Sequence, residues 1–279
     1  MPSAALRPLS AGELLDVSFG LFRRLFRTLV TIQLVCMALP FLINVYVAGT
    51  GQQVSAATLL GALVGFVLSA LASAATAVAI SGSYLDRPVG PTEALRRALP
   101  RLGPLLIVSL LVGLLVVLSS IPFFVLFAGA GFTLARNGAA VSGLVLFSML
   151  VGIASLVLPL MVAAGVAVST PVVVLEEQVG AVEALSRAWF LTRGYRLRIA
   201  GLLFVCLILI MIPYMALLAI GGALAGGSAQ PVWIAVVALL GRLLLTPILY
   251  CLLTLLYYDL RVRKEGFDLE MLAASLQPA

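Results

Sequence analysis

Few side chains of this protein could carry out chemistry, and the most unusual of them is Arg242. The chain contains no histidine, and histidine is the commonest general base and metal ligand. Its three cysteines, Cys36, Cys206 and Cys251, lie in separate apolar runs without a C-x-x-C spacing, so we expect them to act as small apolar side chains. The sequence therefore predicts a protein that is not an enzyme and binds no metal or other cofactor.

Arg242 lies within the last apolar run, about 15 Å along it if the run is helical. A guanidinium near the middle of a bilayer costs about 2.5–3.5 kcal/mol on insertion scales. The apolar runs contain no acidic residue to offset that cost. Two interpretations remain open: Arg242 contacts an anion, a lipid or a partner subunit, or its long side chain reaches the outer headgroups.

The remaining arginines occur in short clusters beside apolar runs. The chain has 17 Lys and Arg against 11 Asp and Glu, and nearly all of the basic residues are Arg. No basic face is interleaved with aromatic residues, so we expect no nucleic-acid partner. Clusters of this kind favour contact with anionic lipid. The candidate anion or lipid contacts are Arg23, Arg24, Arg27, Arg96, Arg97, Arg193 and Arg196.

The composition predicts an integral membrane protein. The chain is 63% hydrophobic and 10% charged, with a mean hydropathy of +1.21, whereas soluble domains are about 25% charged. No cleavable signal peptide is expected at the start. Six runs are long enough to span a bilayer, at roughly 28–48, 57–81, 104–128, 140–168, 199–221 and 232–257.

The fourth apolar run continues through Pro171 to Leu175. We interpret it as one long, kinked helix followed by an extended exit, because proline disfavours helix in the residue before it. The alternative is one long helix that continues to Leu175.

The charges indicate the orientation of the chain. The loops 49–56 and 222–231 carry no charge and the loop 129–139 carries only Arg136, while the other connections are rich in arginine. By the positive-inside rule, both termini are cytoplasmic. The preference for Arg over Lys, with many Ala, Leu, Val and Gly, suggests a GC-rich bacterial genome, so the expected location is the bacterial plasma membrane.

A short motif occurs three times, at Leu9–Leu15, Val89–Leu95 and Val179–Leu185. Its glutamates, Glu13, Glu93 and Glu183, are 80 and then 90 residues apart. Each copy has the features of a helix start, with a cap at Ser10, Gly90 or Gly180 and a carboxylate in the first turn. In the first copy, Ser10 and Glu13 predict a capping box.

The first copy opens an amphipathic segment over residues 10–27, with Leu15, Phe19, Phe22 and Phe26 on one face. Such a helix can lie in the plane of the headgroups or pack its apolar face on the protein, and both readings stay open. The first span of each copy then carries a proline, namely Pro40, Pro122 and Pro213, and proline tends to bend a helix.

These observations predict an all-α integral membrane protein with a single membrane domain over residues 1–279. Its six transmembrane helices form three parallel tandem repeats, each an amphipathic cytoplasmic interfacial helix followed by a two-span hairpin. The repeats cover about 9–87, 88–177 and 178–263, followed by a cytoplasmic tail at 264–279. Parallel copies differ from the inverted repeats of many transporters.

Two segments, Leu6–Asp16 and Tyr257–Gly266, resemble the bacterial glycerophosphodiester phosphodiesterase membrane-domain family. The resemblance implies a multi-span bacterial membrane module. The phosphodiesterase chemistry of the family's fused catalytic domain needs histidines that this chain lacks, so that activity is not implied here.

Two functions are therefore expected as alternatives. The first is a non-enzymatic module that contacts anionic lipid at the cytoplasmic face and a protein partner, either another membrane protein or a second copy. The second is a small carrier or lipid-handling protein with an anion-binding cavity near Arg242.

Overall fold

The computed structural model describes residues 7–50, 56–136, 143–176, 179–225 and 230–267, and all secondary structure in these ranges is helical. Six helical stretches are long and apolar enough to cross a membrane: Ala11–Val47, Thr58–Tyr84, Pro91–Arg136, Gly143–Leu175, Arg196–Ala223 and Trp233–Glu265. These stretches confirm the predicted all-α, multi-pass membrane protein.

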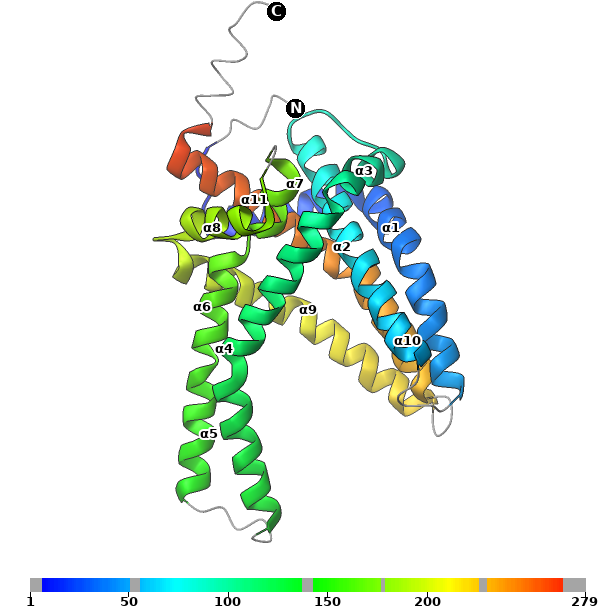
Figure 1. The fold of residues 1–279 in the computed structure, drawn as a ribbon, viewed down its shortest axis with the longest axis vertical. Coiled ribbons are helices and arrows are strands. Elements are labelled where there is room, and N and C mark those ends of the chain that lie inside the picture. Colours follow the sequence, from blue (N-terminus) through cyan, green and yellow to red (C-terminus); the bar gives the residue numbers. More distant parts are fainter. Residues whose placement is uncertain (1–6, 51–55, 137–142, 177–178, 226–229, 268–279) are drawn as a thin grey trace, which may run out of the picture.

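The long helices form two groups that join at one end (Figure 1). The helices α1 (Ala11–Thr50), α2 (Ala56–Tyr84) and α10 (Gln230–Leu244) lie together, and α4 (Leu102–Arg136) pairs with α5 (Gly143–Ser155). The helix α9 (Arg196–Ala225) crosses from the second group to the first.

The two groups meet at the end that holds α3 (Pro91–Ala98), α8 (Ala181–Thr192) and the last turns of α11 (Thr246–Glu265). We call this the charged end, and it comprises residues 7–27, 84–101, 175–176, 179–198 and 258–267. From this end the chain runs outward along α1, α4 and α9, and it comes back along the helices that follow each of them.

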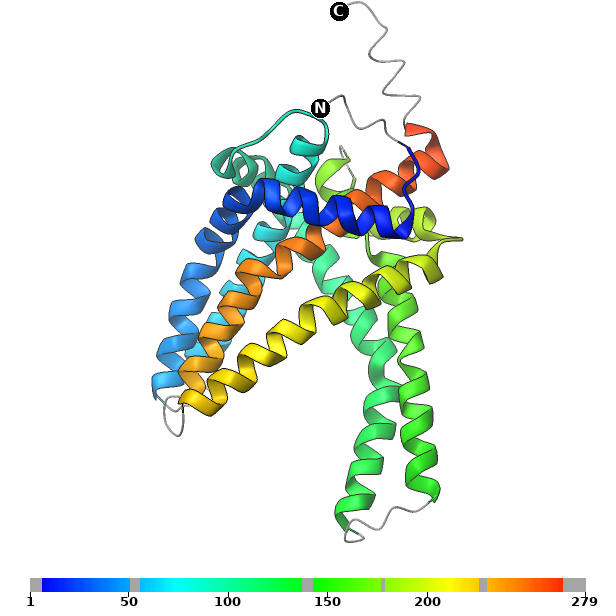
Figure 2. The ribbon, with the colours of Figure 1, turned by 180° about the vertical axis from the view of Figure 1, so that it is seen from behind.

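The first predicted segment and the first span are one continuous helix, α1. Its beginning lies across the charged end and the rest descends beside α10 (Figure 2). Leu14 and Leu29 are fully buried and Ser18 nearly so, which places one side of the crossing part against the protein. The predicted phenylalanine face is offset from this side and ends at Phe26, which is 41% exposed.

The fourth apolar run contains three helices, α5, α6 (Val157–Val166) and α7 (Ser169–Leu175). The predicted extended exit is therefore wrong, because residues 169–175 are helical. Pro159 and Pro171 each occupy the first turn of a new helix, where a missing N–H breaks no hydrogen bond. The prolines thus divide the run instead of ending it.

The core of the protein lies next to the charged end and is organised around α11. From Cys251 to Leu260 every residue but Leu253 is buried, and α11 contacts α1, α2, α7, α8 and α10. The far parts of the long helices differ: Leu110 and Val117 on α4 are more than 60% exposed. Such apolar surface suits a lipid environment and not water.

Candidate functional site

The strongest polar cluster at the charged end surrounds Asp259, whose side chain is fully buried. One carboxylate oxygen accepts a hydrogen bond from the backbone N–H of Leu9 at 2.7 Å. The other accepts from Arg198 at 3.1 Å and from Arg263 at 2.9 Å. Both arginines also donate to the carbonyl of Leu9, at 2.5 and 2.7 Å. Asp259 therefore joins the N-terminal segment, the start of α9 and the end of α11.

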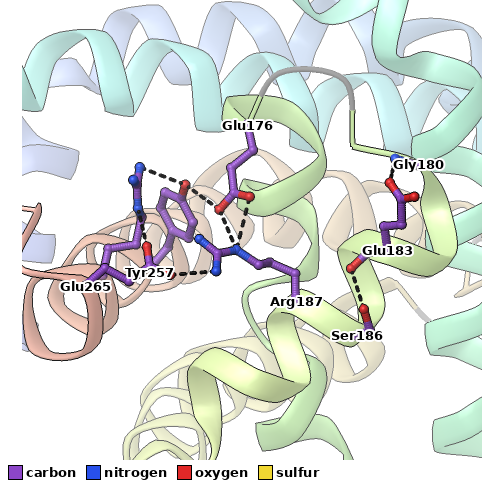
Figure 3. Close-up of polar contacts among 8 residues, drawn as sticks. Glu176, Gly180, Glu183, Ser186, Arg187, Tyr257 and Glu265 are labelled. Atoms are coloured by element: carbon purple, nitrogen blue, oxygen red, sulfur yellow. Dashed lines mark hydrogen bonds and ion pairs between the residues drawn. The ribbon is translucent and has the colours of Figure 1, made fainter.

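A second cluster joins α7, α8 and α11 (Figure 3). Arg187 of α8 lies 3.2 Å from Glu176, directly after α7, and 2.6 Å from Glu265. Tyr257 donates to Glu176 at 3.1 Å, and Arg261 binds Glu265 at 3.1 Å. Burial lowers the pKa of Arg187, but the carboxylates of Glu265 and Glu176 outweigh it and leave that pKa above its usual value.

A third contact connects α11 to α2. The hydroxyls of Tyr258 and Ser81 are 2.6 Å apart and both side chains are buried. The ring of Tyr84 packs on Tyr258 with the centroids 5.3 Å apart.

Sequence reasoning missed this role of residues 257–265, which contribute to the hydrogen bonds of all three clusters. A signal was present, because Asp259 lies between two tyrosines and two arginines directly after an apolar run. Buried carboxylates are nearly always paired.

The predicted arginine contacts fall into three kinds: exposed, paired with a carboxylate, and stacked on an aromatic ring. Arg23, Arg24, Arg27 and Arg96 are exposed, and among the described residues no carboxylate forms an ion pair with any of them. Arg97 instead binds Glu93 at 2.8 Å. Arg193 is exposed, and the guanidinium of Arg196 lies 3.7 Å from the ring centroid of Trp189.

Two of the three repeat glutamates accept a hydrogen bond from the backbone of their cap residue, and Glu93 does not. Glu13 accepts from the backbone of Ser10 at 2.7 Å and Ser10 accepts in return, so the predicted capping box is present. Glu183 accepts from the backbone of Gly180 at 3.1 Å. Glu93 binds Arg97 one turn later.

The three prolines lie inside helices that continue past them. Pro40 is in α1, Pro122 in α4 and Pro213 in α9. The bends expected at these residues stay a prediction. In α1 the side chain of Asn44 donates to the carbonyl of Pro40 at 2.8 Å.

A cavity of about 700 Å³ opens between α1, α2 and α10. Its polar side chains are Asn44 and Ser69, and its lining residues on α10 include Ala238 and Leu239. Arg242 belongs to α10, one turn further along the helix than these two residues. Its side chain lies outside the described residues, so the predicted anion site there stays a prediction.

The sequence contains no histidine, and within the described ranges no group of His, Cys, Asp and Glu could hold a metal ion. Glu176, Asp259 and Glu265 are all bound to arginines. The arrangement can hold helices together and leave positive charge at the surface.

Comparison of the chain with protein-family models, with curated proteins and with solved structures gives no match.

Proposed function

We propose that this chain is a non-enzymatic membrane module that contacts anionic lipid headgroups and a protein partner through its charged end. The supporting observation is the division of its arginines. Internal carboxylates form ion pairs with four of them, namely Arg187, Arg198, Arg261 and Arg263. Arg23, Arg24, Arg27 and Arg96 remain exposed, with no ion pair to a described carboxylate.

Exposed arginines at the ends of membrane spans lie at the depth of lipid headgroups. Each one near an anionic membrane surface contributes about 1 kcal/mol of attraction. The attraction falls off over a Debye length, about 10 Å at 0.1 M salt. Because the internal carboxylates are already paired, the unpaired arginines give the charged end its positive potential.

The charged end faces the cytoplasm of a bacterium in this proposal, with both termini on that side of the plasma membrane. The asymmetry of arginine between the two ends supports it. The resemblance to the bacterial glycerophosphodiester phosphodiesterase membrane-domain family is part of the same proposal.

The three motif copies are tandem repeats with the same orientation in this proposal. The residue after each glutamate is fully buried, and the residue four positions later is at most 1% exposed. These pairs are Leu14 and Ser18, Ala94 and Ala98, and Ala184 and Ala188. The same buried face in all three copies is what an ancestral repeat would preserve.

The protein partner, a different membrane protein or a second copy of this chain, would contact the module beside its lipids. The support is the apolar surface of α4, where Leu110, Leu114 and Val117 are more than half exposed. The rest of the described chain does not cover these side chains.

Native mass spectrometry tests the lipid contact. The full chain is mixed in mild detergent with equal amounts of phosphatidylglycerol and phosphatidylcholine, and the lipids that stay bound after release from the detergent are measured. The wild type should retain phosphatidylglycerol preferentially at low salt. The variant Arg23→Gln/Arg24→Gln/Arg27→Gln removes about 3 kcal/mol of attraction and should lower that retention on the order of 100-fold at unchanged Tm.

Arg136→Gln is the matched control, because Arg136 is exposed at the opposite end of α4. It should retain phosphatidylglycerol as the wild type does. The proposal is contradicted if the wild type retains both lipids equally. It is also contradicted if the triple variant retains as much phosphatidylglycerol as the wild type.

The cavity between α1, α2 and α10 supports the second candidate, a small carrier or lipid-handling protein. Its volume of about 700 Å³ is in the range of small-molecule sites. Asn44 and Ser69 would give a polar solute hydrogen-bonding partners, and Arg242 would supply the positive charge for an anion.

Thiol labelling in liposomes tests the carrier. In a variant whose native cysteines are changed to alanine, Ser69→Cys should react with a membrane-impermeant maleimide if the cavity holds water. Leu63→Cys is the control, since Leu63 lies on the same helix with 61% exposure and does not line the cavity. Equal, slow labelling at both positions would remove the carrier as a candidate.

A further inference from the structure

Three cations meet where α8 ends and α9 begins. The ammonium of Lys264 donates to the carbonyl of Phe190 at 2.6 Å, and the backbone N–H of Arg193 donates to the same oxygen at 3.2 Å. Lys264 therefore caps the C-terminal end of α8 and lies beside Arg193. An ammonium has three N–H donors, and this contact uses one of them.

Arg196, the first residue of α9, is held in place by stacking. Its guanidinium lies 3.7 Å from the ring centroid of Trp189. The same ring packs against Gly165, where an added Cβ would lie 2.3 Å from a ring atom. The Nε atom of Arg196 is buried and has no hydrogen-bond partner in the described part of the chain.

In the described part of the chain, the three cations lack an ion-pair partner. Within the described ranges no ion pair connects Arg193, Arg196 or Lys264 to a carboxylate. Both arginines repel the Lys264 ammonium, and Glu265 attracts it. Glu265 is itself bound by Arg187 at 2.6 Å and by Arg261 at 3.1 Å, so its charge is already offset.

The position of the cluster suits a lipid headgroup. The span formed by α9 begins at Arg196, which places the cations at the membrane surface. Trp189 and Phe190 beside them are 42% and 54% exposed. Large aromatic side chains are enriched at this depth, where a ring meets both headgroups and the start of the acyl chains.

We propose that Arg193, Arg196 and Lys264 form one defined binding site for the phosphate of an anionic phospholipid. Arg193 and Lys264 bind the phosphate oxygens with their free N–H groups, and Trp189 and Phe190 pack against the glycerol and upper acyl chains. This site rests on the proposed function and goes further, because it distinguishes one lipid position from a diffuse attraction to all exposed arginines.

The fluorescence of Trp189 reports directly on this site. The chain has two tryptophans, so the variant Trp233→Phe leaves Trp189 as the single emitter. The full chain in non-ionic detergent is titrated with dihexanoyl phosphatidylglycerol, dihexanoyl phosphatidylcholine and inorganic phosphate. We expect a saturable change with phosphatidylglycerol, little change with phosphatidylcholine, and a half-maximal phosphate concentration at least ten-fold above that of phosphatidylglycerol.

In this background, Arg193→Gln should weaken the binding of dihexanoyl phosphatidylglycerol about five-fold, the equivalent of ~1 kcal/mol. Arg193 is exposed, so this change leaves the fold intact. Lys264→Gln should weaken binding by a similar factor. Lys264 also donates to the last turn of α8, so Lys264→Gln could change the stability of the fold. The Tm of the Lys264→Gln variant is therefore measured in parallel, and the result for Arg193→Gln decides the outcome.

Arg87→Gln is the matched control, since Arg87 is an exposed arginine at the charged end outside the cluster. It should leave the affinity unchanged. If Arg87→Gln weakens binding as much as Arg193→Gln, the attraction is diffuse and the defined site is wrong, although the proposed function stands. If inorganic phosphate saturates the signal as readily as the lipid, the lipid assignment is wrong. If no titrant changes the emission, the site is also wrong, and the native mass spectra decide the proposed function separately.

Discussion

Asp259 shows how a single residue can unite distant parts of a membrane protein. Its carboxylate is fully buried and is bound by Arg198, Arg263 and the backbone of Leu9. A buried carboxylate is costly unless each oxygen is hydrogen-bonded to a donor. Here both oxygens are bound, and both arginines also satisfy the carbonyl of Leu9. The cluster therefore fixes the N-terminal segment against α9 and α11.

Asp259→Asn should destabilise the protein by about 3 kcal/mol. The change leaves Arg198 and Arg263 without their shared charge, and breaking buried pairs costs about 3–5 kcal/mol. We take the lower figure because both arginines are more than a fifth exposed. Tm in detergent provides the measurement.

Asp16→Asn is the control, because Asp16 is an exposed aspartate of the same end. It should change Tm by no more than a surface substitution does. Equal Tm values for the two variants would show that the Asp259 cluster does not stabilise the fold.

Among the helices, α1 and α2 pack closely at Gly61. A Cβ built at Gly61 would lie 2.6 Å from the Cγ2 atom of Ile43, whereas one at Gly65 would meet Pro40 at an ordinary 3.7 Å. Small residues let helix backbones approach each other in membranes. The four-residue spacing of these glycines indicates such a contact in the sequence, but only the structure shows that Gly61 carries it.

Gly61→Ala should therefore lower stability by about 1–3 kcal/mol, the usual cost of adding a methyl group to a packed contact. Gly113→Ala provides the comparison, since nothing lies within 4 Å of a Cβ at Gly113 on α4. Alanine is the better helix former, so that variant should be neutral or slightly more stable. Tm values in the opposite order would mean that Ile43 moves aside without cost.

The two ends of the molecule differ in what holds their helices together. The charged end contains the ion-pair clusters and adjoins the buried residues of α11, whereas α4 and α5 beyond it expose large apolar side chains. Lipid contributes no hydrophobic driving force between helices, so packing and polar contacts must hold them. The clusters at the charged end supply such contacts, and the far parts of the helices are left to lipid or to a partner.

Much of the fold could be predicted from the sequence, because it depends on composition and on contacts within one helical turn. The six spans follow from long apolar runs, and the helix starts at Ser10, Gly90 and Gly180 follow from capping residues and a nearby glutamate. The prediction failed at residues 169–175, since local proline statistics do not reveal that Pro171 lies in the first turn of a new helix.

The sequence alone determined that this protein crosses a membrane and that its charges gather beside its spans, since both follow from residue types along the chain. Only the tertiary structure decided which arginines are paired and which are exposed. Asp259 meets Arg198 from 61 residues away and Leu9 from 250 residues away. Such contacts depend on how distant helices pack, and a pattern within one segment carries no information about them.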